Sequence, residues 1–167
     1  MELKWKHPFT AMSCGPTSCG KSTFVTRFLK HLDELTDADF CEVVYCAPES
    51  SYPDLSECKV PVKFMDCIPD VAIFADKKPR LIILDDLMSE AATDSRVTSI
   101  FTRDSHHMGL STIFITQNIF HKGKGMRDIS LNCHFIVVFK SPRDRGQITS
   151  LARQICPGNT KYISEIF

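Results

Sequence analysis

The sequence lacks an excess of charge of either sign. Twenty Lys and Arg residues balance twenty Asp and Glu residues, so the formal net charge is zero and gives no global indication of a nucleic-acid partner. The charges are nevertheless unevenly placed. Residues 31–60 carry eight acids and one base, whereas residues 121–153 carry seven bases and two acids. This polarity could orient the protein on a polyanion or against a neighbouring subunit, or it could simply give two solvated faces.

Paired cysteines and long apolar runs are also absent. No CxxC pair occurs, and His106 and His107 have no cysteine at a ligand-like spacing, so we expect no structural metal. The amino terminus lacks the apolar core of a signal peptide, and no apolar run approaches the ~18 residues that cross a bilayer. We therefore expect a soluble, intracellular protein without a membrane partner. Five of the eight cysteines lie in or beside apolar strand-like segments and are expected to be buried reduced thiols: Cys14, Cys41, Cys46, Cys67 and Cys133.

The sequence contains no repeat, no low-complexity tract and no evident linker. Residues 1–167 are therefore expected to form a single domain, which is large enough to bury a core. Short apolar segments alternate with segments of helical periodicity, and this alternation predicts a three-layer α/β fold with a mostly parallel central sheet. Strands are expected over 9–12, 41–48, 60–67, 80–86, 110–118 and 133–140, and helices over 21–35, 70–75, 92–107 and 143–155.

A glycine-rich segment, GPTSCGKST, lies between the first expected strand and the first expected helix. It matches the pattern G-x-x-x-x-G-K-[ST] in the context that a phosphate-binding P-loop requires. Glycines let the backbone wrap closely, so that N–H groups and the helix N-terminus face phosphate oxygens. Lys21 is expected to reach the β and γ phosphates of ATP, and Ser22 to hold Mg²⁺. A plain turn before a helix is the alternative. The predicted nucleotide-binding residues are Gly15, Pro16, Thr17, Ser18, Cys19, Gly20, Lys21, Ser22 and Thr23.

Two aspartates follow the buried-strand segment LIIL. Asp85 emerges at the carboxyl end of that strand, where ligands gather in open α/β sheets, and is predicted to contact Mg²⁺ directly or through water. Asp86 stands where many ATPases of this plan carry a glutamate that activates water. Because aspartate is one methylene shorter, Glu90 could take that role instead, and Asp86 could serve only as a helix N-cap.

The segment ITQN ends the next expected strand at the same sheet edge. Gln117 is predicted to sense the γ phosphate or to orient water, because phosphoryl transfer depends mainly on positioning and charge stabilisation. The alternative is that these side chains only cap the turn after the strand. If the enzyme forms a ring, an arginine from a neighbouring subunit is expected at the site, and Arg103, Arg127 and Arg143 are the candidates.

The number of expected strands bears on the order of the sheet. Two strand-like segments separate the P-loop from the Asp85 strand in sequence. We take this spacing to favour the ATPase plan, in which a strand is inserted between those two, over the nucleotide-kinase plan, which keeps them adjacent.

In this order the segments GPTSCGKSTFVTRFL, LIILDDLMSE, FTRDSHHMGLSTIFITQNIF, RDISLNCHFIVVFKSPRDRGQI and LARQICP resemble the FtsK/HerA-type genome-packaging ATPases of double-stranded DNA viruses. The likeness is greatest to those of Polinton (Maverick) elements, adintoviruses and related virophage or poxvirus-like lineages, and it extends over residues 9–157. It implies a RecA/ASCE-like core in a hexameric ring that hydrolyses ATP to move viral DNA into a preformed capsid. Lys21, Ser22, Asp85, Asp86 and Gln117 match the family's nucleotide motifs, and Arg127 and Arg143 match interface or DNA-facing positions.

The resemblance also implies partners and a location. Double-stranded DNA, capsid or portal-vertex proteins and further copies of the chain would be the partners, in the host nucleus or a cytoplasmic virus factory, with transient association with the virion. Family members usually continue for another strand or more beyond YISEIF, which implies either a chain truncated at its C-terminus or a short variant of the family. The family more often has a smaller residue at the position of Cys19. This cysteine could make nucleotide binding redox-sensitive, or it could be a harmless small hydrophobic residue. The alternative function is an ATP-dependent switch or scaffold that docks to capsid proteins with slow turnover.

Overall fold

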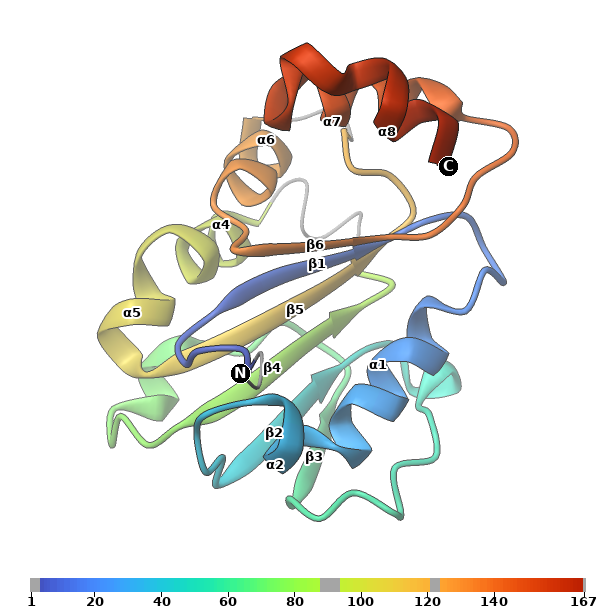
Figure 1. Ribbon diagram of the computed structural model, residues 1–167. Coiled ribbons are helices and arrows are strands. Elements are labelled where there is room, and N and C mark those ends of the chain that lie inside the picture. The colour runs from blue at the N-terminus through green and yellow to red at the C-terminus, as the bar shows by residue number, and fades with distance from the viewer. Residues whose placement is uncertain (1–3, 88–93, 121–123, 167) are drawn as a thin grey trace.

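The computed structural model describes residues 4–87, 94–120 and 124–166, and in these ranges six parallel strands form one central sheet (Figure 1). Every strand pairing is parallel, and the order across the sheet is β3-β2-β4-β5-β1-β6. This architecture confirms the predicted α/β fold. The strands are β1 (Thr10–Cys14), β2 (Glu42–Cys46), β3 (Val62–Met65), β4 (Arg80–Asp85), β5 (Leu110–Thr116) and β6 (Phe135–Val138).

Helices cover both faces of the sheet. Figure 1 shows α1 (Lys21–Lys30) and α2 (Leu32–Leu35) on one face. The opposite face carries α4 (Ser95–Ser99), the π-helical η3 (Ile100–Asp104), α5 (Ser105–Met108), α6 (Lys124–Leu131), α7 (Arg145–Ile155) and α8 (Thr160–Ile166). No helix in the described ranges has both the length and the apolar character needed to span a bilayer. Short 3-10 helices occupy Glu49–Ser51 (η1), Val71–Phe74 (η2) and Pro157–Asn159 (η4).

The sheet separates two apolar cores, because successive side chains of a strand point to opposite faces. In β4, Ile82 and Leu84 pack with the residues from α4 to α6, whereas Leu81 and Ile83 pack with Val25, Phe28 and Leu29 of α1. All four β4 residues are fully buried. This burial on both faces explains the uninterrupted aliphatic run that the sequence shows at 81–84.

The strand order places β5 between β1 and β4, as the ATPase plan requires. The inserted strand is β5, which follows both of its neighbours in sequence. The two segments that lie between the P-loop and the Asp85 strand in sequence form β2 and β3, on the far side of β4. Because β1, β5 and β4 run parallel, their carboxyl ends meet at one edge of the sheet, and the segments that follow them converge there.

Two expected helices differ in detail from the observed ones. The helix expected over 21–35 is interrupted at His31, whose φ of −113° is not helical, and α2 resumes after it. The chain after this break is tied to the N-terminal segment, since the Trp5 N–H donates to the Leu35 carbonyl at 2.8 Å. The helix expected over 92–107 is described from Ser95 and ends at Gly109, whose φ of 64° terminates it, but it contains the π-helical η3 that periodicity does not reveal.

The prediction that five cysteines are buried is only partly correct. All eight cysteines are free thiols, and Cys14 and Cys46 are buried within strands. Cys133 is half-buried, whereas Cys41 and Cys67 are exposed. The reason is their position: Cys41 precedes β2 and Cys67 follows β3, so both lie beyond the strand ends and outside the covered part of the sheet.

Candidate functional site

The loop between β1 and α1 is wrapped tightly and held closed by its own lysine. Gly20 has a φ of 100° and Ser18 a φ of 61°, so the backbone passes twice through the left-handed region before the helix begins. The Lys21 ammonium donates hydrogen bonds to the carbonyls of Gly15 and Pro16, both at 2.8 Å. The Lys21 side chain therefore folds back over the loop, and its ammonium group points into the loop.

Gly15 is packed so closely that no side chain fits there. A Cβ atom at this position would lie 2.6 Å from the Phe139 Cβ and 2.8 Å from the Cys19 Sγ. The backbone of the segment after β6 also approaches here, since the Phe139 N–H donates to the Cys14 carbonyl at 2.7 Å. The loop is therefore shaped by the strand beside it as well as by its own glycines.

Replacing Gly15 by alanine is expected to destabilise the fold by about 1–3 kcal/mol, because the added methyl overpacks against a neighbouring backbone segment. Nucleotide affinity should fall as well, since the loop must open to relieve the contact. Urea unfolding and nucleotide titration measure the two effects. Gly158→Ala is the matched control, because nothing lies within 4 Å of its Cβ position. Equal stability of the two variants would contradict the close packing described for Gly15.

Asp85 is the buried carboxylate of the site. It ends β4, is only 8% exposed, and its Oδ2 accepts hydrogen bonds from the Tyr45 hydroxyl at 2.7 Å and the Ser22 hydroxyl at 3.2 Å. Ser22 is the second residue of α1, so this bond joins the loop-helix unit to the end of the strand two places away in the sheet. The predicted pair of metal-binding residues is thus in direct contact.

The pKa values of Asp85 and Tyr45 are both displaced by burial. Burial raises the pKa of Asp85, although the hydrogen bonds from Tyr45 and Ser22 and the charge of Lys21 act in the opposite direction. Burial, together with the neighbouring Asp85 carboxylate, raises the pKa of the Tyr45 hydroxyl. Tyr45 therefore stays protonated and acts as a hydrogen-bond donor to the carboxylate.

A cavity of about 220 Å³ lies between these elements. This volume is below the ~300–1,000 Å³ of pockets that enclose a whole small molecule, so the cavity suits the phosphate end of a nucleotide. Its hydroxyl and carboxylate oxygens are the hard donors that Mg²⁺ prefers, and a lysine provides positive charge. The residues present therefore fit ATP phosphates with Mg²⁺. The lining residues are Thr17, Ser18, Lys21, Ser22, Ser51, Asp85, Asp86, Ile115, Thr116 and Gln117.

The polar residues at the end of β5 divide into two kinds. Thr116 and Asn118 stabilise the turn: the Asn118 side-chain oxygen accepts from the Phe120 N–H at 2.9 Å, and the Thr116 hydroxyl donates to the Asn118 carbonyl at 3.3 Å. For these two residues the capping interpretation accounts for the contacts. Gln117 is exposed and lines the cavity, which is the position needed for a role toward phosphate or water.

Asp86 is exposed, lines the cavity and has a φ of 54°. An N-cap residue normally has extended backbone, so this conformation does not match that alternative. The described helix that follows, α4, is capped by Asp94, which accepts from the Arg96 N–H at 2.8 Å. Glu90, the other candidate for the water-activating acid, lies outside the described residues.

The three arginine candidates lie in different places. Arg103 bonds Asp104 at 3.1 Å and the Ser99 hydroxyl at 3.1 Å on its own helix. Arg127 is exposed on α6 and does not line the cavity of its own chain. Arg143 lines a second hollow of about 770 Å³, which adjoins the first and shares Thr17 and Gln117 with it. The chain's own fold thus brings only Arg143 near the site.

Sequence reasoning missed two residues of the site. Tyr45 lies within β2, the strand next to β4, and bonds Asp85, whereas Ser51 lies in η1, in the segment that follows β2, and lines the cavity. Neither belongs to a local motif. The contact of Tyr45 with Asp85 depends on the pairing of β2 with β4, and the sequence does not show which strands pair.

No model of a known protein family matches the chain, and neither does any curated protein. Solved structures do match. The genome-packaging NTPase B204 of Sulfolobus turreted icosahedral virus 2, in complex with ATP-gammaS, superposes with a TM-score of 0.64 at 13% identity, over 93% of this chain and 86% of that one. Its complex with AMP gives a TM-score of 0.61 at 13% identity, over 98% and 88%.

The cytoplasmic domain of EssC also matches, with a TM-score of 0.53 at 14% identity, over 86% of this chain and 33% of that chain. At such low sequence identities, these superpositions establish a common fold alone. Like the viral packaging NTPase B204, the chain has the three-layer α/β fold of P-loop NTPases, with an all-parallel sheet flanked by helices on both faces.

Proposed function

We propose that the protein is a magnesium-dependent ATPase that drives the packaging of double-stranded viral DNA into a preformed capsid. The observation that carries the proposal is the contact between Ser22 of the P-loop helix and Asp85 at the end of β4, with β5 inserted between β1 and β4. The fold likeness to the packaging NTPase B204 supports the packaging role.

Each residue of the cavity has a distinct proposed role. The loop from Gly15 to Thr23 would hold the phosphates with its backbone N–H groups, and Lys21 would exchange its two carbonyl partners for β- and γ-phosphate oxygens. Ser22 and Asp85 would hold Mg²⁺, whose positive charge would neutralise the charge of the phosphates.

The remaining roles concern the attacking water and the γ phosphate. Asp86 would accept a proton from the attacking water, and Gln117 would orient that water or sense the γ phosphate. An arginine of a neighbouring subunit, with Arg127 preferred over Arg103 and Arg143, would complete the charge stabilisation in a hexameric ring.

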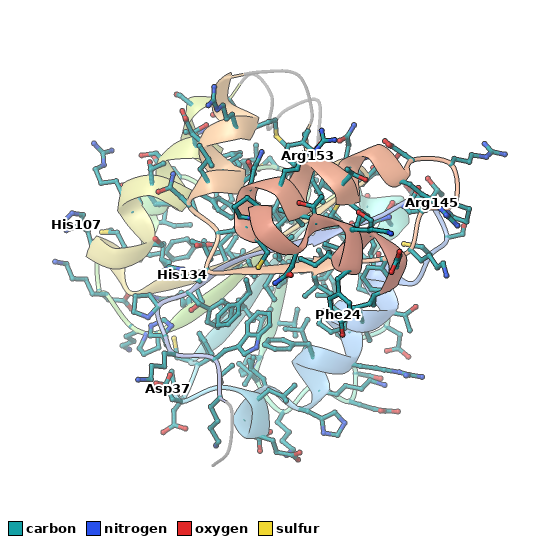
Figure 2. All side chains as sticks on the ribbon, turned by 45° about the horizontal axis from the view of Figure 1, so that its top comes forward. Phe24, Asp37, His107, His134, Arg145 and Arg153 are labelled. Carbon is teal, nitrogen blue, oxygen red and sulfur yellow. The ribbon has the colours of Figure 1, made fainter. Side chains whose placement is uncertain are left out.

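The DNA-binding surface would include the basic segment 121–153. Arg145 and Arg153 are exposed on α7 (Figure 2), and Arg127, Lys140 and Arg143 are exposed as well. In a ring these charges would face the duplex, while other surfaces of the motor would contact capsid or portal-vertex proteins. We place this activity in the host nucleus or a cytoplasmic virus factory.

Duplex DNA is expected to increase the rate of ATP hydrolysis several-fold, and the increase should fall as salt rises from 50 to 200 mM, because the phosphate contacts are screened. Steady-state hydrolysis with and without DNA, with molar mass measured by light scattering, tests this. The charge reversals Arg145→Glu and Arg153→Glu together should lower the DNA-stimulated part. Lys63→Glu with Lys78→Glu is the matched control, since both lysines are exposed and lie outside the basic segment.

The other outcomes separate the alternatives. Tight ATP binding with negligible turnover and no response to DNA would favour the switch or scaffold that docks to capsid proteins. A protein that binds no nucleotide would overturn the P-loop interpretation itself.

A further inference from the structure

We propose that Tyr45 is a positioning residue, which fixes the carboxylate of Asp85 for magnesium coordination. The inference rests on the proposed ATPase function and extends it to a residue outside the nucleotide motifs. It starts from one contact between two buried side chains: the Tyr45 hydroxyl donates to Asp85 Oδ2 at 2.7 Å.

The pairing of β2 with β4 brings the two residues together. Tyr45 is opposite Ile83, and Cys46 is opposite Leu84, so Asp85 lies two residues beyond the partner of Tyr45 on the neighbouring strand. Residues 83 and 85 share one face of β4, and Tyr45 packs with Ile83 in the α1-side core. The aromatic side chain is long enough to reach this diagonal neighbour along the same face.

Packing holds the Tyr45 side chain in place. A short side chain at this position would not reach Asp85. The exposed fraction of Tyr45 is 0%, and its ring lies 5.9 Å from that of Phe64. In the described part of the chain its hydroxyl makes one hydrogen bond, and this bond goes to Asp85. A phenylalanine would fill the core equally well. The hydroxyl adds a polar group whose burial is tolerated because the carboxylate accepts its hydrogen bond.

The bond also determines which oxygen of Asp85 is available. Oδ2 accepts both hydrogen bonds that described residues make to this carboxylate, one from Tyr45 and one from Ser22. Oδ1 is therefore the oxygen left to receive a cation or its bound water. If Ser22 directed its hydroxyl oxygen to a cation instead, Tyr45 would still hold Oδ2. Partners of this kind fix the orientation of a metal-binding carboxylate, and their loss typically lowers metal affinity 10–100-fold.

The test is the magnesium dependence of nucleotide binding in Tyr45→Phe. A fluorescent ATP analogue is titrated into the variant in EDTA and at a series of Mg²⁺ concentrations. The Mg²⁺ concentration for half-maximal enhancement of binding should rise about tenfold or more, while affinity in EDTA stays as in wild type. Hydrolysis should show the same shift in Mg²⁺ requirement and recover at saturating Mg²⁺. Tyr52→Phe is the matched control, because its ring stacks on the same Phe64 at 4.6 Å.

A measurement without substitution at Tyr45 covers the case in which that variant does not fold. The chain has three tyrosines, so ¹³Cζ-labelled tyrosine gives three NMR signals, which Tyr52→Phe and Tyr162→Phe assign. Adding Mg²⁺ to the nucleotide complex should shift the Tyr45 signal and leave the exposed Tyr162 unchanged. A folded Tyr45→Phe with wild-type magnesium dependence, or an unshifted Tyr45 signal, would overturn this role while leaving the ATPase intact. A wild-type protein that binds no nucleotide would overturn the ATPase, and this role with it.

Discussion

Lys21→Ala is expected to reduce ATP hydrolysis by at least about 100-fold, the effect typical of removing one group that stabilises developing charge. The side chain already supplies the geometry for this role, because its ammonium lies within the loop at 2.8 Å from the carbonyls of Gly15 and Pro16. Phosphate oxygens would replace those carbonyls as acceptors. Steady-state phosphate release measures the loss, and titration with a fluorescent nucleotide shows how much of it is binding.

The control is Lys30→Ala, on the same helix. Lys30 bonds Glu57 at 2.7 Å on the surface, an ion pair of the kind that contributes about 0–1 kcal/mol, so hydrolysis should be unaffected. Lys21→Arg keeps the charge but presents a planar fork in place of a compact ammonium, and it should not restore activity. If Lys21→Ala hydrolysed ATP at the wild-type rate, this result would contradict the proposal that the loop binds the phosphates.

Asp85→Asn is expected to have two effects of opposite direction. Hydrolysis should fall at least about 100-fold, because the neutral amide loses the charge proposed to hold magnesium. Stability at neutral pH should rise, because burial raises the pKa of Asp85 and the ionised carboxylate therefore destabilises the folded state. The amide oxygen can still accept from Tyr45 and Ser22, so the substitution leaves both hydroxyls with a partner.

The stability effect should depend on pH in a defined direction. The Asp85 pKa in the folded state lies above that of the unfolded chain, about 3.9, so the folded state binds the proton more tightly. Wild-type stability should therefore fall as pH rises from about 4 through the folded-state pKa, and stay reduced above it. Urea unfolding of wild type and Asp85→Asn should show the gain near neutral pH and its disappearance near pH 4.

Asp66→Asn is the matched comparison, because Asp66 is exposed directly after β3 at the same edge of the sheet. Its effect on stability should stay within about 0.5 kcal/mol at both pH values. An Asp85→Asn variant that is less stable than wild type near neutral pH would show that the carboxylate is a net stabilising group. Retained hydrolysis would remove Asp85 from the metal site.

The parts of the site that could be predicted from sequence are those fixed by local chemistry. The spacing of Gly15, Gly20 and Lys21 describes one continuous loop, and a helix start follows it. Asp85 could be placed because an uninterrupted aliphatic run identifies a strand buried on both faces, and the next polar residue must emerge at its end. These inferences need no knowledge of how distant segments pair.

The parts that could not be predicted depend on pairing and on local backbone. The contact of Tyr45 with Asp85 follows from the register of β2 on β4, which no periodicity encodes. In the sequence, a tyrosine within an apolar strand is typical of core packing. The break at His31 and the π-helical η3 are likewise local backbone features that helical periodicity does not reveal.

The strand order also has a consequence for the synthesis of the chain. Of the six described strands, β1 leaves the ribosome first, but its two neighbours are β5 and β6, and β6 ends at Val138. The loop between β1 and α1 lies against the segment that follows β6, through Gly15 and Phe139. A nascent chain shorter than this cannot assemble the loop in its native surroundings, and such long-range pairing is slow to form. The nucleotide that we propose for this loop would therefore stabilise the protein only after β6 has been made and has paired with β1.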